Sequence, residues 1–455
     1  MSPNPGNFRW TICALLFFSV ALNYIHRLTI SNLKGPLSEQ LGWSEVHYGY
    51  VAGAFSFAYA FGYLLAGRVI DRVGVKRGLT VCTLLWSAAA MAHGLCSLIN
   101  TQAQFELSYP WFSLAKGGMV MLTLAMPMTA AGFAAARIVL GLAQGGNFPA
   151  AIKAVAEWFP VHERALATGI FNAGTNVGSI ICPLVVVWMF KHWGWETTFY
   201  VTGAIGFAWT AAWLWLYDTP EKHRLLSASE LQHIKSGETA PAGQPQRIGW
   251  ISLLGYRAVW AYIIAGILAA PAWVFYQFFI PDFLTKTFGL SLTATARATS
   301  AFYVLAAFGG VIGGWLAGRL LKRGWSLNAA RKVSLLACAL AVVPVCLAPH
   351  APSAWLAVLI VGIAGSAHQG WSANLFSFVS DTMPRAAISS VVGFGGFVGY
   401  FTGGIINTIT GYILEKTGSY VGVFVYFSCT YLVSLLALHL LVPKIGQQPV
   451  ETKNE

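Results

Sequence analysis

Long apolar runs recur along this chain and constrain its fold more than any other feature. We expect about twelve of them, each near the ~20 residues that an α-helix needs to cross the hydrocarbon of a bilayer. Only 10% of the 455 residues are charged, against roughly 25% in ordinary soluble domains. The sequence therefore predicts an all-α membrane protein with many spans. The expected spans are 9–31, 48–70, 78–99, 119–148, 164–188, 197–217, 257–281, 296–320, 332–348, 354–378, 388–411 and 422–443.

One long polar interval divides the spans into two sets of six. It covers about 218–256 and is rich in charged residues, Pro and Gly, a composition typical of a linker. We therefore expect a six-helix N-terminal half, 1–217, and a six-helix C-terminal half, 257–443. The linker 218–256 and a tail, 444–455, are expected in the cytoplasm.

Basic residues predict this orientation, because cytoplasmic loops carry an excess of Lys and Arg. The loops expected on the other side of the membrane carry few Lys and Arg residues, so both termini are expected in the cytoplasm. The formal net charge of +12 comes from these scattered clusters, which form no continuous face for nucleic acid. The clusters between spans 2 and 3 and between spans 8 and 9 are Arg68, Arg72, Lys76, Arg77, Arg319, Lys322, Arg323, Arg331 and Lys332.

Two internal repeats indicate duplicated halves. The segment "GRVIDRVGVKRG" (67–78) is similar to "GRLLKRGWSLNAARK" (318–332), and "EWFPVHERALATG" (157–169) to "SDTMPRAAISSVVG" (380–393). The two repeats are further apart in the first half than in the second. This difference predicts an insertion outside the membrane, around "INTQAQFELSYPWFSLAKGG".

The first loop repeat resembles the loop signature of the major facilitator superfamily, and the resemblance extends over nearly the whole chain. Two longer stretches, "NFPAAIKAVAEWFPVHERALATGIFNAGTNVGS" and "AHQGWSANLFSFVSDTMPRA", are similar to the hexuronate transporters of its anion:cation symporter branch. The resemblance implies twelve transmembrane helices in two six-helix halves, in the cytoplasmic (inner) membrane of a bacterium.

Ionisable side chains inside a span are costly unless they pair or line an aqueous cavity. Four such residues are candidates: His26, Arg27, Arg137 and Lys153. The planar guanidinium of Arg27 can hold a carboxylate in bidentate fashion, although it could instead cap carbonyls of a neighbouring helix. Arg137 lies about two helical turns before Gln144, which predicts that both share one face of span 4 and serve either the site or the scaffold. For Lys153, near the end of that helix, we favour snorkelling.

A sugar also needs neutral hydrogen-bonding groups and a flat apolar surface. In the related organic-anion transporters, residues matching Tyr24, Arg27, Tyr59 and Asn176 line the site. Each aromatic residue could alternatively serve as packing or as an interfacial anchor. The candidates for binding the sugar are Tyr24, Tyr59, Asn172, Asn176, Gln369 and Asn374, with Trp273 and Tyr276 for its apolar face.

The family resemblance also raises the question of proton coupling. Its members commonly have an Asp before the Arg of span 1 and a carboxylate in span 4, where this chain has His26 and Gln144. We expect His26 to carry the coupled proton, because its imidazole titrates near neutrality and a bound carboxylate favours the charged form.

Loop residues at the cytoplasmic side are expected to act as a gate. Asp71 can cap a helix N-terminus of the other half, while Arg72 and Arg77 tie neighbouring helix ends. The glycine-rich segment "GFGGFVGYFTGG" (393–404) suits close helix packing or bending and follows no strand, so it does not indicate a nucleotide site.

Together these features predict a secondary transporter that imports a hexuronate anion with a proton. An aldonate or another organic anion, a uniporter or exchanger, and a membrane sugar-acid sensor are the alternatives. We expect a monomer in the lipid bilayer that binds no nucleic acid, metal or cofactor. Motifs of hydrolases and metalloproteases are absent, which argues against an enzyme. The single cysteines, which we interpret as packing residues, are Cys13, Cys82, Cys96, Cys182, Cys338, Cys346 and Cys429.

Overall fold

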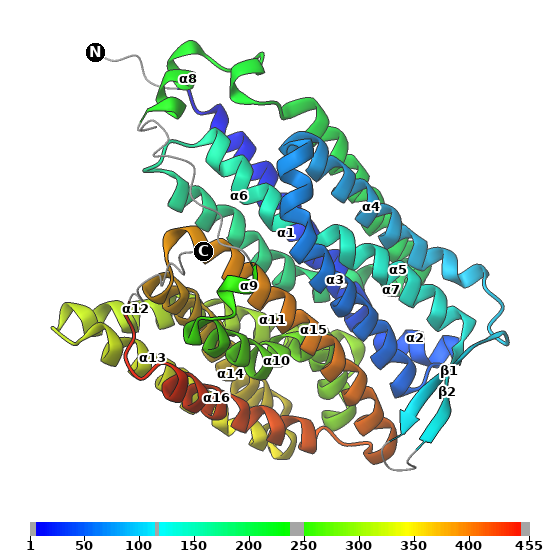
Figure 1. Ribbon diagram of the computed structural model, residues 1–455. Coiled ribbons are helices and arrows are strands. Elements are labelled where there is room, and N and C mark those ends of the chain that lie inside the picture. The colour runs from blue at the N-terminus through cyan, green and yellow to red at the C-terminus, as the bar shows by residue number, and fades with distance from the viewer. Residues whose placement is uncertain (1–5, 114–117, 237–249, 447–455) are drawn as a thin grey trace.

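Eleven helical stretches in the computed structural model are long and apolar enough to cross a membrane (Figure 1). The structure describes residues 6–113, 118–236 and 250–446. The 53-residue helix α7 (Arg164–Leu216) is too long for a single crossing and bends at Gly194, where a φ of 80° suits glycine. Because α7 supplies two crossings, the described chain has the twelve that the sequence predicts.

The first set of helices comes before the linker. The fourth crossing consists of two consecutive helices, α5 and α6, because the helix is interrupted after Gln144. A short helix, α2, follows α1, and a 3-10 turn, η1, follows α4. The bounds are α1 (Phe8–Asn32), α2 (Lys34–Leu41), α3 (Glu45–Val73), α4 (Val75–Leu95), η1 (Cys96–Leu98), α5 (Met128–Gln144) and α6 (Asn147–Trp158), followed by α7.

The second set repeats this pattern after the linker. The loop repeats fall at equivalent junctions, α3–α4 with α12–α13 and α6–α7 with α14–α15, as expected for duplicated halves. Within the linker, residues 237–249 lie outside the described part. The linker elements are η2 (Pro220–Lys222), α8 (Ala228–Lys235) and α9 (Trp250–Leu253); the later helices are α10 (Arg257–Phe288), α11 (Leu292–Ala307), α12 (Gly309–Lys322), α13 (Leu327–Val342), η3 (Val343–His350), α14 (Ala354–Thr382), α15 (Arg385–Thr417) and α16 (Val421–Leu441).

The expected insertion forms a β-hairpin. Strands β1 (Gln104–Ser113) and β2 (Gly118–Pro127) are antiparallel, with Gln104 opposite Pro127. The start predicted for the fourth crossing, residue 119, is therefore wrong, because this crossing begins at Met128. The backbone of 118–127 pairs with β1, so this apolar run is not available to the helix.

The hairpin and the linker lie at opposite ends of the molecule (Figure 1). We call these the hairpin end and the linker end. At the linker end, Lys76 at the start of α4 pairs with Asp218 at 3.1 Å. At the hairpin end, the indole of Trp43 donates a hydrogen bond to Thr129 at 3.0 Å. The basic α3–α4 loop therefore lies on the same side as the linker.

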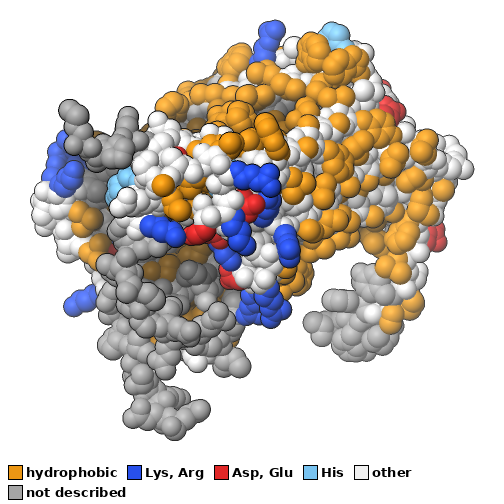
Figure 2. Space-filling view, turned by 90° about the horizontal axis from the view of Figure 1, so that it is seen from above, with side chains coloured by type: hydrophobic (Ala, Val, Ile, Leu, Met, Phe, Trp, Pro, Cys, Tyr) orange, Lys and Arg blue, Asp and Glu red, His pale blue; other side chains and the backbone are white. Residues whose placement is uncertain are grey.

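The flank of the molecule is strongly apolar. Figure 2 shows hydrophobic side chains over the upper and right parts of the visible face, with a group of Lys and Arg near its centre. Large apolar side chains point outward along many helices, including Phe18, Leu65, Trp215, Val311 and Leu440, each more than half exposed. Such a surface suits contact with lipid rather than water.

The two halves meet along three helix pairs, α3 with α15, α1 with α10 and α7 with α11. Helices α3 and α15 approach closely near the hairpin end, where a Cβ added to Gly411 would lie 2.6 Å from the carbonyl oxygen of Glu45. A glycine is therefore needed there. Further along the same pair, Asn407 donates to Ser56 at 3.3 Å. These contacts close the hairpin end of the interface.

Candidate functional site

A cavity of about 610 Å³ lies between the two halves. This volume is within the roughly 300–1,000 Å³ of sites for small molecules. Its wall reaches Ile152 and Thr168 in the first half and Phe376 and Val392 in the second, residues near the linker ends of their helices. The cavity therefore extends from the middle of the molecule toward the linker end, while the hairpin end is closed.

Arg27 is fully buried on α1 directly beside this cavity. Its guanidinium donates to the side-chain oxygens of Asn23 at 3.2 Å, Gln144 at 3.4 Å and Tyr400 at 3.3 Å. All three partners are neutral. Within the described ranges, no Asp or Glu forms an ion pair with Arg27, so its charge is left for an anionic ligand.

Aromatic rings surround the Arg27 guanidinium. Its central carbon lies 4.7 Å from the ring centroid of Tyr24, 4.4 Å from that of Tyr59 and 6.0 Å from that of Tyr400. Cation–π contacts of this kind stabilise a desolvated cation. The three tyrosines also line the cavity, and they form the boundary between it and Arg27.

The position of Arg27 depends on helix α5. Arg137 donates to the carbonyl oxygen of Arg27 at 3.0 Å, and Gln144 donates to that of Asn23 at 2.9 Å. Both residues thus face α1, as their spacing predicts. Close packing of α5 on α3 helps, because a Cβ added to Gly141 would lie 2.6 Å from the carbonyl oxygen of Phe55. Arg137 itself lies outside the cavity wall and acts as a scaffold.

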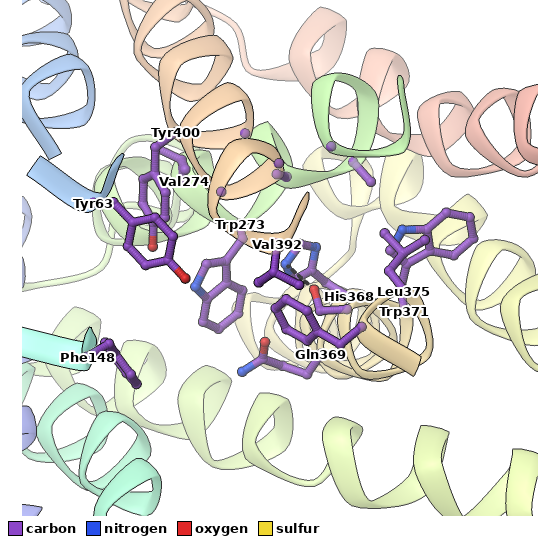
Figure 3. A pocket seen from close by; sticks show the side chains of 18 of the residues that line it. Tyr63, Phe148, Trp273, Val274, His368, Gln369, Trp371, Leu375, Val392 and Tyr400 are labelled. Carbon is purple, nitrogen blue, oxygen red and sulfur yellow. Dashed lines mark hydrogen bonds between the residues drawn. The ribbon is translucent and has the colours of Figure 1, made fainter. Parts of the chain in front are cut away.

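The cavity brings several of the predicted binding residues together. Tyr24, Tyr59 and Asn172 line it from the first half, and Trp273 and Gln369 from the second. Figure 3 shows Trp273 and Gln369 near the centre, with Phe148 of the first half across from them. A flat indole and neutral polar groups on opposite walls provide the surfaces that a sugar ring needs.

Four predicted binding residues do not line this cavity: Arg27, which lies directly behind its tyrosines, and three others. Asn374 donates to the carbonyl oxygens of Gly313 and Gly370, and so joins α14 to α12. Tyr276 is fully buried between Phe302 and Phe427 in the core of the second half. Asn176, one turn after Asn172 on α7, is half-buried but outside the wall.

The proton-coupling candidates also lie behind the wall. The Nε2 atom of His26 is 2.8 Å from the carbonyl oxygen of Thr202, so His26 faces α7, and only 2% of its surface is exposed. Gln144 is buried, its side-chain oxygen accepts a hydrogen bond from Arg27, and its side-chain nitrogen donates one to the carbonyl oxygen of Asn23. Neither side chain is among the residues that line the cavity.

The sequence analysis missed Tyr400 and His368, which both line the cavity. Tyr400 stands in the glycine-rich segment of α15, where Gly395, Gly396 and Gly399 also line the wall. These glycines let Tyr262, Tyr63 and Ala270 pack closely against α15. The signal for His368 was present, since the rule that selected His26, an ionisable group within an apolar run, applies equally to it.

The proposed gate residues are exposed at the linker end. Asp71 forms an ion pair at 3.0 Å with Lys153, which belongs to the same half. The expected contact of Asp71 with a helix of the other half is therefore not present in this conformation, in which the cavity separates the halves at that end. Arg72 and Arg77 lie beside it on the exposed α3–α4 junction.

Charged residues join the halves at the opposite end. Lys34 of the first half lies 2.6 Å from Glu45 and 2.5 Å from Asp282 of the second half. Asp282 also pairs with Lys286 at 3.5 Å and accepts a hydrogen bond from Tyr420. We call these five residues the hairpin-end cluster. Lys34 and Asp282 are almost fully buried, so the cluster is a sealed contact between halves.

A second ionic contact attaches the linker to the first half. Arg9 pairs with Glu163 at 2.8 Å and with Glu230 of α8 at 3.3 Å. Burial alone raises the pKa of Glu163, but hydrogen bonds from Arg9 and His233 outweigh it and lower the pKa below its usual value. The ionised carboxylate therefore helps to hold α8 in place.

Twelve crossings surround a central cavity in this chain, and comparison with known proteins identifies its family. The sequence model of the Major Facilitator Superfamily matches residues 16–407. The chain belongs to the Major Facilitator Superfamily. Within this superfamily it resembles the hexuronate transporters, as the sequence motifs indicate.

Two relatives and one solved structure illustrate the similarity of this superfamily member to known transporters. A hexuronate transporter of Escherichia coli (strain K12) is 28% identical over 414 residues, 90% of this chain and 88% of the relative. A galacturonate transporter of Dickeya chrysanthemi is 30% identical over 310 residues, 68% of this chain and 81% of the relative. The crystal structure of a D-xylose-proton symporter superposes with a TM-score of 0.72 at 14% identity, covering 96% of this chain and 98% of that one. That structural match supports the fold alone.

Proposed function

We propose that this protein is a secondary transporter that imports a sugar acid anion, a hexuronate such as galacturonate or glucuronate, together with a proton. The observation that carries the proposal is Arg27, a buried cation with neutral partners beside the cavity between the halves. The names of the hexuronate and galacturonate transporters among its relatives support the same class of substrate.

In this proposal, the carboxylate of the sugar acid enters the cavity and reaches the guanidinium of Arg27 between the rings of Tyr24, Tyr59 and Tyr400. A bidentate pair replaces the hydrogen bond to Tyr400, whose hydroxyl then turns to the ligand. Trp273 contacts the C–H face of the sugar, while Asn172 and Gln369 bind its hydroxyls. These contacts distinguish a sugar acid from a neutral sugar.

Transport follows from alternating access. The linker end is the cytoplasmic side in the proposed orientation, with both termini in the cytoplasm and the chain in the inner membrane as a monomer. The cavity extends toward that end while the hairpin-end cluster is closed, so the described conformation is open to the cytoplasm. In the opposite conformation Asp71, Arg72 and Arg77 close the linker end, and the cluster separates.

Uptake of labelled galacturonate by proteoliposomes, with and without an inward pH gradient, tests this function. We expect saturable uptake, accumulation driven by the gradient, and competition by glucuronate but not by uncharged galactose. Stronger competition by galactonate would assign the site to an aldonate. Uptake without gradient dependence would indicate a uniporter, and binding without uptake would indicate a sensor.

A further inference from the structure

The wall of the cavity contains few groups that can bind a proton near neutral pH. Within the described residues, the wall carries no Asp, Glu, Lys or Arg. Its titratable side chains are phenols and one imidazole, and of these only an imidazole ordinarily titrates near pH 6.5. The imidazole belongs to His368, and the phenols to Tyr24, Tyr59, Tyr63, Tyr262 and Tyr400.

Access is the first requirement for a coupled proton. In alternating access, a proton carrier exchanges with whichever side the cavity faces, so the carrier must lie on the cavity wall. His368 meets this requirement, and Figure 3 shows it next to Trp273 on the wall. His26 does not, because its ring lies between α1 and α7 with Nε2 at the carbonyl oxygen of Thr202.

The hydrogen bonds of His368 leave a site for that proton. Its Nδ1 lies 2.6 Å from the hydroxyl of Tyr431, which can donate its own hydrogen to the carbonyl oxygen of Ala269 at 3.3 Å. Nδ1 then carries the hydrogen, and Nε2 is a hydrogen-bond acceptor. Nε2 lies 3.3 Å from the hydroxyl of Ser372, a residue of the cavity wall.

Protonation at Nε2 requires little rearrangement. The Ser372 hydroxyl turns from donor to acceptor, and the bond from Nδ1 to Tyr431 is kept. The imidazole also lies parallel to the Trp273 indole, with 5.4 Å between ring centroids and 5° between planes. The negative face of an indole stabilises a cation in this position.

We infer that His368 is the proton-coupling site of this transporter, an inference that rests on the proposed function. Among the described residues, no carboxylate forms an ion pair with His368, so its imidazolium lacks a counter-ion until an anion enters the cavity. The substrate carboxylate favours the proton on Nε2, and the proton favours the substrate. This reciprocity is the thermodynamic requirement for symport.

The groups around His368 are consistent with proton and substrate favouring each other's binding. Phenols and thiols are ordinarily neutral at pH 7, so they supply no competing counter-ion. Arg27 is the cation beside the same cavity and disfavours the imidazolium until the substrate anion neutralises it. The titratable groups on the elements packed around α14 include Tyr262 of α10, Tyr303 of α11, Cys338 of α13 and Tyr400 of α15. Tyr431 of α16 contacts His368 through its hydrogen bond.

The principal test compares His368→Gln with His26→Gln in purified, reconstituted protein. For the wild type we expect galacturonate affinity to increase as pH falls, by up to about tenfold per pH unit above the pKa of the site. His368→Gln is expected to bind with little pH dependence and to exchange galacturonate without concentrating it. His26→Gln is expected to keep both the pH dependence and the concentrative uptake.

A second variant protects the test against misfolding. Tyr431→Phe removes the hydroxyl that accepts the hydrogen bond from Nδ1–H of His368. A charged imidazolium depends on this acceptor more than a neutral ring does. We therefore expect the midpoint of the pH dependence of galacturonate binding to move to lower pH. A folded His368→Gln that concentrates galacturonate with the wild-type pH profile overturns the inference, as does an unchanged midpoint in Tyr431→Phe. Absence of galacturonate binding and exchange in the wild type would instead overturn the proposed function.

Discussion

Arg27 combines burial, positive charge and neutral hydrogen-bond partners. Such a guanidinium is expensive to keep in a membrane protein unless a ligand uses it. Because an ammonium cannot form a bidentate fork, we expect Arg27→Lys to weaken galacturonate binding roughly 10- to 100-fold, equivalent to about 1.5–3 kcal/mol. Calorimetric titration of the purified variants measures the change.

Arg137→Lys is the matched control for this substitution. Arg137 is buried like Arg27 but donates to a backbone carbonyl outside the cavity wall, so we expect its replacement to lower thermal stability more than affinity. A folded Arg27→Lys protein with wild-type affinity would remove Arg27 from the carboxylate site.

At the residue scale, the sequence predicted the first-half wall better than the second. Tyr24 and Tyr59 of this wall, and Arg27 behind them, follow from aromatic and ionisable residues within apolar runs, together with the family motif. Asn374 and Tyr276 have the same chemical character as wall residues, but they face neighbouring helices. The side of a buried helix that faces the cavity depends on tertiary packing. When every face of the helix is apolar, the sequence does not indicate which side this is.

At the scale of elements, the apolar run 118–127 shows where hydropathy fails. Apolar residues continue through this run into α5, so a window of hydropathy joins them into one span. In the structure the first ten residues pair with β1, and helix α5 begins at Met128. Pairing with a distant segment is not visible in composition, and periodicity alone does not separate a short apolar strand from a helix.

Helix α8 offers a test at the same scale. The ionised Glu163 holds Arg9, which also holds Glu230 of α8. Because the pKa of Glu163 is lowered from its usual 4.5, the contact is complete above that pH and is lost as pH falls through the lowered pKa. We expect a spin label at Gln232→Cys on α8 to become more mobile in that acidic range.

Two carboxamide variants complete the α8 experiment. Glu163→Gln is expected to give a mobile label already at pH 7. Glu221→Gln is the control, because Glu221 pairs with Lys235 of α8 at 3.4 Å but both side chains are about half exposed, and such pairs contribute little. Equal mobility in the two variants would contradict the role of Glu163.

At the scale of the whole molecule, the hairpin-end cluster and the cavity describe one conformation. Lys34 and Asp282 bring the halves together at the hairpin end, while the cavity separates them toward the linker end. During transport the molecule must also populate the conformation that is open at the hairpin end and closed at the linker end. The cluster must therefore be weak enough to separate in each transport cycle. The free energy of this contact therefore contributes to how the two conformations are populated.

Asp282→Asn is expected to shift the molecule toward the conformation open at the hairpin end. The substitution removes the charge that Lys34 meets from the other half but keeps the size of the side chain. Weakening this buried contact by about 1–3 kcal/mol corresponds to a shift of roughly 5- to 150-fold in the equilibrium. In a background without native cysteines, Ala270→Cys on the cavity wall reports the shift through labelling by an impermeant maleimide added outside whole cells.

Glu39→Gln is the matched control for the Asp282 experiment, because Glu39 is an exposed carboxylate on α2 at the same end of the molecule. We expect maleimide labelling to be several times faster in Asp282→Asn and unchanged in Glu39→Gln. Asp282→Asn with added Lys34→Met removes both buried charges, while the ion pair between Lys286 and Glu45 still joins the halves. We expect this double variant to label no faster than Asp282→Asn alone, in which Lys34 has lost its partner from the other half. Labelling at the wild-type rate in a folded Asp282→Asn protein would show that helix packing, and not this ion pair, holds the hairpin end closed.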